Sequence, residues 1–365
     1  MNFWFVILSL MGLAGLAGLF YLVTRFRKFG FMQKIAEKSK LLSWLLACAC
    51  VASTFLFGLI NIYAVVVVII HLALIWIICD IAAAIVGKHR GKRSERYIAG
   101  IVALAITTVY MTGAWIAAHH VWETDYTITS DKVDSPLRIA LIADSHLGIT
   151  LDGEDFAKEM EKVQAANPDV VVIVGDYVDD DSEKADMLRA CEALGDLSTT
   201  YGVFFVFGNH DMGYYNSRDF SAQDLKGALI ANGVAILEDK TVPIGDDYVL
   251  VGRRDRSMTW RASAGELMAQ TDASKYSIML DHQPNDYDSE AAAGADLVLS
   301  GHTHGGHMFP AGYVGLIMKS NDSLYGLEQR GTTNFIVTSG ISGWAVPFKS
   351  GTHSEYVIVD VIPAP

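Results

Sequence analysis

Side chains of the kinds that bind divalent metal ions follow five apolar runs between residues 137 and 301 of the sequence. In chain order, the clusters are Asp144 with His146, Asp176 with Asp179, Asn209 with His210 and Asp211, His282, and His302 with His304 and His307. Histidine nitrogens combined with Asp and Asn oxygens suit Mn, Fe, Zn, Ni or Co. Such ions ionise water and polarise phosphoryl oxygens. The sequence therefore predicts a site for metal-assisted hydrolysis and leaves the identity of the metal open.

Each cluster also has an ordinary structural explanation. Gly, Asn and Asp favour turns, so the GNHD sequence around Asn209 could be a turn without chemistry. A single Asp-x-His sequence, such as Asp144 with His146, is common at the end of a strand. His302 and His304 are a stronger signal, because a glycine-bounded loop presents two imidazoles. The occurrence of all five clusters directly after strand-like runs favours one metal centre over five unrelated turns.

The elements that would position these clusters alternate between short β-branched runs and amphipathic segments. We expect strands at 137–143, 170–174, 203–207, 234–238, 247–252, 276–281, 296–300, 334–338 and 355–361, and helices at 154–166, 182–197 and 219–232. This alternation predicts an α/β sandwich whose strand-rich later part forms a second sheet. Because ligands of open α/β sheets bind at the carboxyl ends of strands, the five clusters can converge on one crevice.

Residues 1–120 differ from this domain in holding long apolar runs. Four stretches are long enough to cross a hydrocarbon core of about 30 Å as helices. They cover approximately residues 3–23, 41–59, 63–82 and 97–118. The first lacks the basic start of a cleavable signal peptide, so we interpret it as a retained span. We therefore expect an all-α bundle of four transmembrane helices in a multi-pass protein of the cell membrane.

Basic residues predict the orientation of these spans. They concentrate in 24–40 and 87–96, which we assign to the cytoplasmic side, so an even number of spans makes the large domain extracytoplasmic. Residues 121–136 are expected to be a linker to a domain at 137–365. Aromatic side chains near this linker are placed like an interfacial belt, namely Trp115, Trp122 and Tyr126. A domain held at the membrane surface favours a membrane-derived substrate.

Charge is divided between the same two parts of the chain. Residues 1–120 have 11 Lys and Arg against 3 Asp and Glu, whereas the remainder has 17 against 38, a net charge of −21. An acidic domain is a poor candidate for a nucleic-acid partner, which requires clustered cations. Two divalent ions would still make the site attractive to a phosphate, because charges beyond about 8–10 Å are largely screened.

The ordered sequences DSH, GDYVD, GNHD, a later His and GHTH resemble the calcineurin-like metallophosphoesterase superfamily over residues 135–361. GHTHGG, TSGISGWAVPF and the apolar N-terminal region are most similar to its bacterial membrane-associated branch. The resemblance implies a four-layer α/β/β/α sandwich and two divalent metal ions. It also implies hydrolysis of a phosphodiester, pyrophosphate or phosphomonoester by a metal-bridging hydroxide. A membrane lipid or cell-envelope intermediate is a substrate class that fits the apolar region.

The same resemblance assigns roles to individual residues. One ion would be bound by Asp144, His146, Asp176 and His304, and the other by Asp176, Asn209, His282 and His302. Asp176 would bridge the two ions, which a shared carboxylate holds roughly 3.5–4 Å apart. His210 would protonate the leaving oxygen or stabilise the transition state, and Asp179 would orient the imidazole of His210.

Three questions remain open at the level of sequence. His307 stands where the branch usually has Gln, so it could contact substrate or lie outside the metal ligands. Arg253, Arg254 and Arg256 follow a strand and could contact a phosphate, or they could lie in a solvated loop. The alternative function is a non-catalytic membrane sensor or scaffold that uses the fold as a binding module. The presence of every expected ligand favours the enzyme.

Overall fold

The computed structural model describes residues 3–90, 96–215 and 217–365 of the chain. The chain forms two compact units, Met1–Gly113 and Ala114–Pro365, referred to below as the N-terminal unit and the C-terminal unit. The boundary lies inside a helix, so the last residues of this helix belong to the C-terminal unit.

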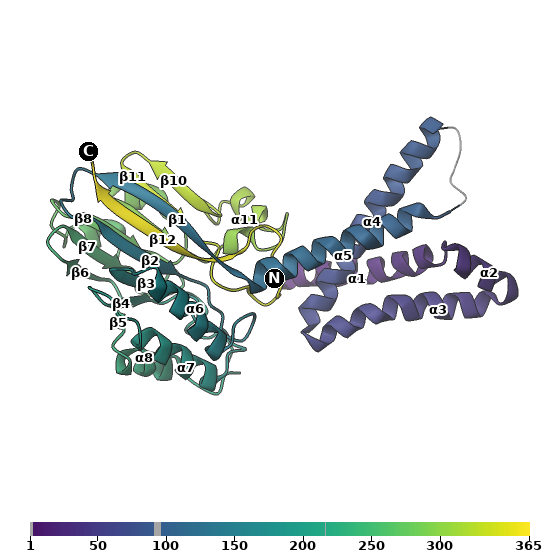
Figure 1. Cartoon of the computed structure of the whole chain (residues 1–365), viewed down its shortest axis with the longest axis horizontal. Coiled ribbons are helices and arrows are strands. Elements are labelled where there is room, and N and C mark those ends of the chain that lie inside the picture. The colour runs from purple at the N-terminus through teal and green to yellow at the C-terminus, as the bar shows by residue number, and fades with distance from the viewer. Residues whose placement is uncertain (1–2, 91–95, 216) are drawn as a thin grey trace. The chain divides into compact units, whose positions relative to one another are not determined.

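Helices make up the N-terminal unit (Figure 1). They are α1 (Phe3–Phe26), α2 (Gly30–Lys38), α3 (Lys40–Ala52), the 3-10 helix η1 (Ser53–Leu59), α4 (Ile62–Arg90) and α5 (Ile98–His119). Within the described residues, three segments are long and apolar enough to cross a membrane, namely Lys40–Leu59, Ile62–His89 and Ile98–His119. Residues Gly12–Phe26 of α1 form a shorter apolar helix. The structure thus supports three of the four predicted spans.

A half-buried acidic group on α4, Asp80, is paired with a cation and two hydroxyls from other parts of the N-terminal unit. The Asp80 carboxylate lies 3.0 Å from Nε of Arg25 and accepts hydrogen bonds from the hydroxyls of Tyr21 (3.1 Å) and Tyr97 (2.7 Å). A charge among apolar helices is costly unless it is paired. The contacts of Asp80 are therefore sufficient for a structural role that ties α1, α4 and the start of α5 together.

Two six-stranded sheets form the centre of the C-terminal unit (Figure 1). The first has the order β1-β12-β2-β3-β4-β5 and comprises Val121–Ser130, Ser354–Pro363, Leu137–Ile142, Val170–Val174, Val203–Val206 and Ala235–Ile236. The second has the order β10-β11-β9-β8-β7-β6 and comprises Gly326–Arg330, Thr333–Val337, Leu297–Ser300, Tyr276–Leu280, Tyr248–Gly252 and Lys240–Ile244. Both sheets mix parallel and antiparallel neighbours, and the strands predicted at 137–143, 170–174 and 203–207 are β2, β3 and β4.

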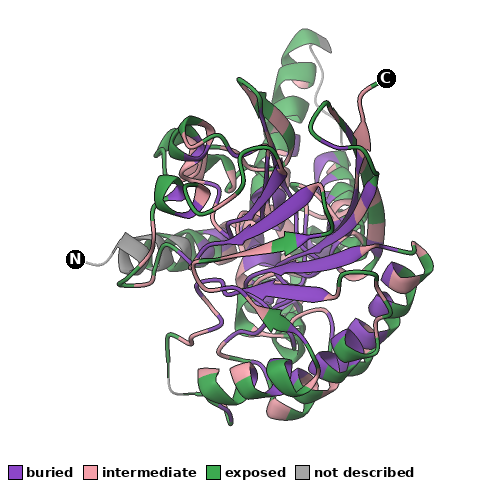
Figure 2. Cartoon of the chain, turned by 90° about the vertical axis from the view of Figure 1, so that its left-hand side faces the viewer, coloured by how far each residue is buried: buried purple, intermediate pink, exposed green. Residues whose placement is uncertain are grey.

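The core of this unit consists of layers, since both faces of each sheet are covered, one by the other sheet and one by helices. Leu141, Val172 and Ile278 belong to one apolar cluster between the two sheets. Helices α6 (Gly153–Ala165), α7 (Lys184–Gly195) and α8 (Ala222–Ala231) cover the outer face of the first sheet. Helices α9 (Ala264–Met268) and α10 (Tyr287–Ala292) cover the second. Figure 2 shows the largely buried strands surrounded by helices with exposed outer faces.

The segment 121–136 is not a simple linker, because residues 121–130 form strand β1. This strand pairs in parallel with β12 along its full length, from Val121 opposite Ser354 to Ser130 opposite Pro363. Tyr126 and Ile128 pack into the core between the sheets, while Glu123 and Asp125 are exposed or half-exposed. Every second side chain thus faces the core, as in a half-buried edge strand. The expectation of a linker is wrong over these ten residues.

Candidate metal centre

The five sequence clusters lie at the carboxyl ends of five parallel strands. Strands β2, β3 and β4 run parallel in the first sheet, and β8 and β9 run parallel in the second. Their ends lead into loops that contain Asp144, Asp176, Asn209, His282 and His302. Parallel strands place their carboxyl ends at one edge of a sheet. The structure accordingly brings side chains of both sheets together in two groups of candidate ligands, and a third group, formed by His146, Asp179 and His210, adjoins them.

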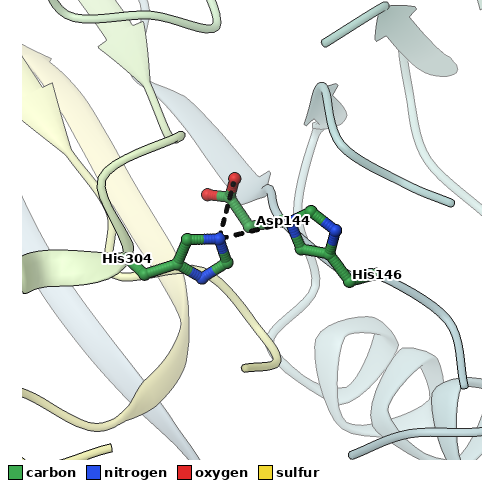
Figure 3. Close-up of side chains that lie close together, drawn as sticks. All are labelled: Asp144, His146 and His304. Carbon is green, nitrogen blue, oxygen red and sulfur yellow. Dashed lines mark hydrogen bonds and ion pairs between the residues drawn. The ribbon is translucent and has the colours of Figure 1, made fainter. Parts of the chain in front are cut away.

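The first group consists of Asp144, His146 and His304 (Figure 3). One candidate ligand atom from each lies within 4.8 Å of the others, and all three side chains are buried. Nε2 of His304 lies 3.2 Å from Nε2 of His146 and 3.7 Å from Oδ1 of Asp144. Two imidazole nitrogens and a carboxylate oxygen therefore face one point, although they come from loops 158 residues apart in sequence.

The second group consists of Asp176, His282 and His302, whose candidate ligand atoms also lie within 4.8 Å of one another. Oδ2 of Asp176 is 3.1 Å from Nε2 of His282. The same oxygen is 3.7 Å from Nε2 of His146, which belongs to the first group. A single carboxylate oxygen of Asp176 thus lies between the two groups.

Hydrogen bonds donated by Nδ1 to oxygen atoms orient three of these imidazoles. Nδ1 of His146 lies 3.0 Å from Asp179 Oδ2, Nδ1 of His282 lies 2.8 Å from the carbonyl of Val174, and Nδ1 of His304 lies 3.4 Å from the carbonyl of Ser342. An Nδ1 that donates to an oxygen leaves Nε2 as the basic nitrogen, which is the arrangement of metal-binding histidines. All three Nε2 atoms point into the two groups.

Asp211, to which the sequence assigned no role, fixes two of the loops. Its carboxylate accepts the backbone N–H groups of Asp176 (3.0 Å), Tyr177 (2.8 Å), Val178 (3.1 Å) and Gly208 (2.7 Å). Gly208 packs so closely that a Cβ there would lie 2.3 Å from Asp176 Oδ1. The loops after β3 and β4 are therefore fixed against each other, which sets the position of Asp176.

Backbone strain is concentrated in the loops of the site. Among the described residues, ten other than glycine have positive φ, and six of these lie in the metal-type clusters. The six are Asp144, His146, Asp176, His302, His304 and His307. Side chains other than glycine adopt this conformation at an energetic cost, and such strain is often found where a functional geometry is enforced.

The carboxylates of the site have opposite pKa shifts. Burial raises the pKa of Asp144 to about 6, and the neighbouring charge of Asp176 acts in the same direction. Burial also acts to raise the pKa of Asp176, but the charge and hydrogen bond of His282 outweigh it and hold that pKa below the usual range. Burial together with the charge of His282 lowers the pKa of His302 to about 4. Asp176 thus keeps its charge to lower pH than Asp144, while His302 stays neutral and able to bind a cation.

His210 lies at the edge of the two groups and is oriented by Asp179. Nδ1 of His210 is 3.0 Å from Asp179 Oδ1, and the backbone N–H of His210 donates to Asp176 Oδ1 at 2.8 Å. The ring of His210 lies 5.0 Å from the ring of Tyr214 and 5.6 Å from that of Trp344. The imidazole of His210 is therefore flanked by two aromatic rings, of which Tyr214 is exposed.

Asn209 is positioned through a relay that the sequence did not reveal. Its Nδ2 donates to the hydroxyl of Tyr214 (2.9 Å), and its Oδ1 accepts from Nε2 of Gln283 (3.4 Å). The same Nε2 of Gln283 is 2.9 Å from Oδ2 of Asp255, which is buried. Gln283 follows His282 directly, so this contact also links the loop after β4 to the loop after β8.

Arg253 is not a phosphate-binding residue, because its guanidinium is 2% exposed and lies among carboxylates. Nη1 of Arg253 is 2.7 Å from Asp281 and 3.0 Å from Glu290, and Nη2 is 2.9 Å from Asp286. The neighbouring Arg254 lies 3.9 Å from Asp239, and Arg256 is exposed. Arg253 therefore neither contacts substrate nor lies in a solvated loop. It instead pairs with Asp281, the residue before His282, and so supports the end of β8.

His307 lies outside both groups. Its Nε2 is 3.1 Å from the carbonyl of Val346, and its backbone carbonyl accepts the N–H groups of Ser350 and Gly351, both at 2.9 Å. Burial, assisted by the charge of Lys349, lowers the pKa of His307 to about 4. These contacts connect the loop after β9 to residues 346–351, so His307 has the geometry of a supporting residue.

Comparison with known proteins agrees with this geometry. A family model described as calcineurin-like phosphoesterase matches residues 137–306, a range that contains all seven predicted metal ligands. An uncharacterized metallophosphoesterase from Campylobacter jejuni is 30% identical over 310 residues, which is 82% of this chain and 79% of the relative. This chain belongs to the calcineurin-like phosphoesterases. The predicted family is confirmed, and with it the class of hydrolases to which the fold belongs.

Two further relatives are similar to large parts of this phosphoesterase. An uncharacterized metallophosphoesterase from Helicobacter pylori is 32% identical over 242 residues, which is 64% of this chain, and this chain spans 62% of the length of that relative. A protein from Danio rerio described as a transmembrane protein with a metallophosphoesterase domain is 29% identical over 301 residues, 73% of this chain and 64% of that protein. The relatives thus include one whose description names a membrane region.

Within this phosphoesterase, Glu355 and Lys349 position a loop that packs on the site. The buried carboxylate of Glu355 accepts hydrogen bonds from Thr338 Oγ1 and Ser339 N, both at 3.0 Å. Nζ of Lys349, also buried, donates to the carbonyls of Ser339 (2.7 Å) and Gly340 (3.1 Å). A Cβ at Gly340 would lie 2.6 Å from that of Asp144. The motif TSGISGW marked this loop through its resemblance to the family. The sequence alone did not indicate that Glu355 and Lys349 support the loop.

The donor set of the phosphoesterase fits divalent metal ions. Among the described residues, Nδ1 of His302 is a buried side-chain nitrogen without a hydrogen-bond partner, and Nε2 of His282 faces the carboxylate of Asp176 at 3.1 Å. Buried polar atoms without a partner are rare and call for an explanation. A bound cation would satisfy both nitrogens, and it would also relieve the 3.2 Å approach of His146 to His304.

Proposed function

We propose that this chain hydrolyses phosphoester bonds with the help of two divalent metal ions. Residues Asp144, His146, Asp176 and His304 would hold one ion, and Asp176, Asn209, His282 and His302 the other. The observation that carries this proposal is the position of Asp176, whose Oδ2 lies 3.7 Å from His146 Nε2 and 3.1 Å from His282 Nε2. When bound, the ions would supply Lewis acidity to phosphoryl oxygens and lower the pKa of water.

The chain's own residues provide the remaining functions in this proposal. His210 lies at the edge of both groups. Its Nδ1 is hydrogen-bonded to Asp179, so Nε2 is the nitrogen that would protonate a leaving-group oxygen. Asp179 bonds to His146 as well, so one carboxylate orients a metal ligand and a proton donor. Tyr214 and Trp344 border His210 and limit the approach of water to it.

We further propose that the protein spans the membrane four times, with α1 as the first span and the C-terminal unit outside the cytoplasm. The three described membrane-length helices and the name of the Danio rerio relative support the membrane region. Basic residues in 24–40 and 87–96 support the orientation. The apolar region and the GHTHGG sequence support the membrane-associated branch of the family, and a substrate that is a membrane lipid or cell-envelope intermediate.

A substrate panel tests the proposed reaction. The purified full chain is assayed with bis-p-nitrophenyl phosphate, p-nitrophenyl phosphate and a phospholipid, each with Mn²⁺, with Zn²⁺ and with a chelator. The proposal expects metal-dependent release of product from at least one substrate and a loss of about 100-fold or more in His210→Ala. Asp181→Asn serves as the matched control, because Asp181 is an exposed carboxylate five residues from Asp176. Hydrolysis that persists equally in the chelator would contradict the proposal, whereas absence of hydrolysis would favour the sensor or scaffold.

A further inference from the structure

An exposed apolar segment, residues 308–318, follows directly after the metal-site loop that contains His302, His304 and His307, and is referred to below as the cap. The cap includes the short helix α11 (Tyr313–Ile317), each residue of which is exposed or half-exposed. Its large apolar side chains are 45% to 80% exposed, and they are Phe309, Tyr313, Val314, Ile317 and Met318. Residues 308–318 contain no charged side chain. Clustered exposed apolar side chains of this kind mark an interaction surface.

The cap is connected to the last turn of the membrane-length helix α5 by a short chain of hydrogen bonds. The N–H of Phe309 donates to Oγ of Ser350 at 3.1 Å, and the N–H of Lys349 donates to the carbonyl of Ala114 at 2.9 Å. Ser350 and Lys349 are consecutive residues, whose Cα atoms are about 3.8 Å apart. Two hydrogen bonds and one peptide step therefore separate the start of the cap from α5.

Further contacts fix the same segment on the end of α5. Oγ of Ser354 donates to the carbonyl of Ala118 at 2.8 Å. The rings of Trp115 and Phe348 meet edge to face at 5.5 Å. Residues 348–354 are thus attached to α5 at its last turn, and they carry the base of the cap through Ser350. All of these residues belong to the C-terminal unit, so the arrangement is internal to it.

We infer that the apolar cap inserts into the interfacial layer of the bilayer at the point where α5 leaves it. Interfacial elements bury their apolar side chains by about 5–10 Å at the boundary of headgroups and acyl chains, a depth that the short connection to α5 allows. Trp115 on this turn is an interfacial type of residue. The inference rests on the proposed function for its chemical consequence: the site would act on phosphoesters presented at the bilayer surface, such as lipid headgroups.

A photo-crosslinking experiment tests the insertion independently of activity. The full chain is reconstituted in vesicles of phosphatidylcholine and phosphatidylglycerol, with p-benzoylphenylalanine replacing Ile317 in one sample and Met318 in another. The matched control replaces Ile230 on α8, since Ile230 is 58% exposed and Ile317 is 80% exposed. The expected result is a phospholipid adduct, identified by its mass, with a yield about tenfold higher at either cap position than at 230. Equal yields, adducts to a second copy of the chain, or no lipid adduct at either cap position would overturn the inference.

A pair of charge substitutions tests the consequence for substrate. Ile317→Asp should lower the hydrolysis of a phospholipid in these vesicles about tenfold, because a charge opposes burial at the interface, and should leave bis-p-nitrophenyl phosphate hydrolysis within about twofold. Ile230→Asp should change neither rate. Equal loss on both substrates, or a chain that cleaves the soluble diester but not the phospholipid, contradicts the substrate part. A chain that cleaves neither substrate refutes the proposed function, and the crosslinking result still decides the insertion.

Discussion

The carboxylate of Asp179 lies 3.0 Å from Nδ1 of His210, and its second oxygen lies 3.0 Å from Nδ1 of His146. One buried acid therefore orients two imidazoles with different assignments, a metal ligand and a proton donor. Burial acts to raise the pKa of Asp179, but its hydrogen bonds to His146 and His210 prevail and hold that pKa well below the usual range. Asp179 is therefore ionised whenever the enzyme is folded near neutral pH.

Replacing this carboxylate should impair catalysis more than folding. Asp179→Asn keeps the shape of the side chain but removes the charge that orients His210 and His146. We expect a fall of about 10–100-fold in kcat, the usual cost of losing the group that orients a metal-bound or catalytic histidine. Steady-state kinetics with saturating metal measure this effect. Asp181→Asn, at an exposed position, should retain full activity, and equal activity of both variants would refute the role of Asp179.

The interaction of His210 with Asp179 also predicts how the pH profile of activity should change in Asp179→Asn. Burial acts to lower the pKa of His210, but the hydrogen bond that His210 donates to Asp179 and the charge of Asp176 outweigh it, so the pKa is raised. In the proposed role of proton donor, His210 would work below its pKa, and activity should fall as pH rises through that pKa. Asp179→Asn removes part of the upward shift and should move the alkaline limb of kcat/KM to lower pH. An unchanged limb would show that another group titrates there.

The buried cation of Arg253, directly after β7, should matter for stability rather than for substrate binding. Arg253→Met keeps much of the volume but removes the cation beside the buried Glu290 and one of the cations beside Asp281, which also pairs with Arg261, and breaking a buried pair of this kind costs about 3–5 kcal/mol. The unfolding temperature of the full chain in detergent should fall by roughly 10 °C. Arg256→Met is the matched control, because Arg256 is exposed and three residues away. A raised KM with an unchanged unfolding temperature would instead show that Arg253 contacts the substrate.

The side of the membrane can be tested with a fusion at Pro365. A reporter enzyme that is active only outside the cytoplasm should be active when fused to this residue, because the basic loops lie in 24–40 and 87–96. A reporter that is active only in the cytoplasm serves as the paired control and should be silent. The reverse pattern would place the C-terminal unit inside the cell and would reduce the number of spans to an odd value.

The sequence predicted the strands that carry the site because these strands are continuous apolar runs. Val170–Val174 is buried on both faces, and such a run has few alternatives to a central strand. Strand β1 was not predicted, because Glu123 and Asp125 give its sequence the polar character of a linker. Its pairing partner, β12, lies more than 200 residues later in the chain. Edge strands depend on pairing that local patterns do not contain.

The side chains that meet at the site were predictable by type, while those that support it were not. Asp144, His146 and His304 stand out as metal-type residues directly after strands. Asp255 and Glu355 look like ordinary acids in the sequence. Their roles depend on partners such as Gln283 and Ser339, which only the fold brings near. Charged residues with a supporting role therefore require the structure to identify them.

Metal content tests the central proposal most directly, because Asp176 lies between both groups of ligands. The full chain and its Asp176→Asn variant are loaded with Mn²⁺ or Zn²⁺, dialysed and analysed for metal per chain, with Asp181→Asn as the control. The account predicts about two ions in the unsubstituted chain and the control, and less than about one, with loss of hydrolysis, in Asp176→Asn. Two ions and full activity in Asp176→Asn would contradict it.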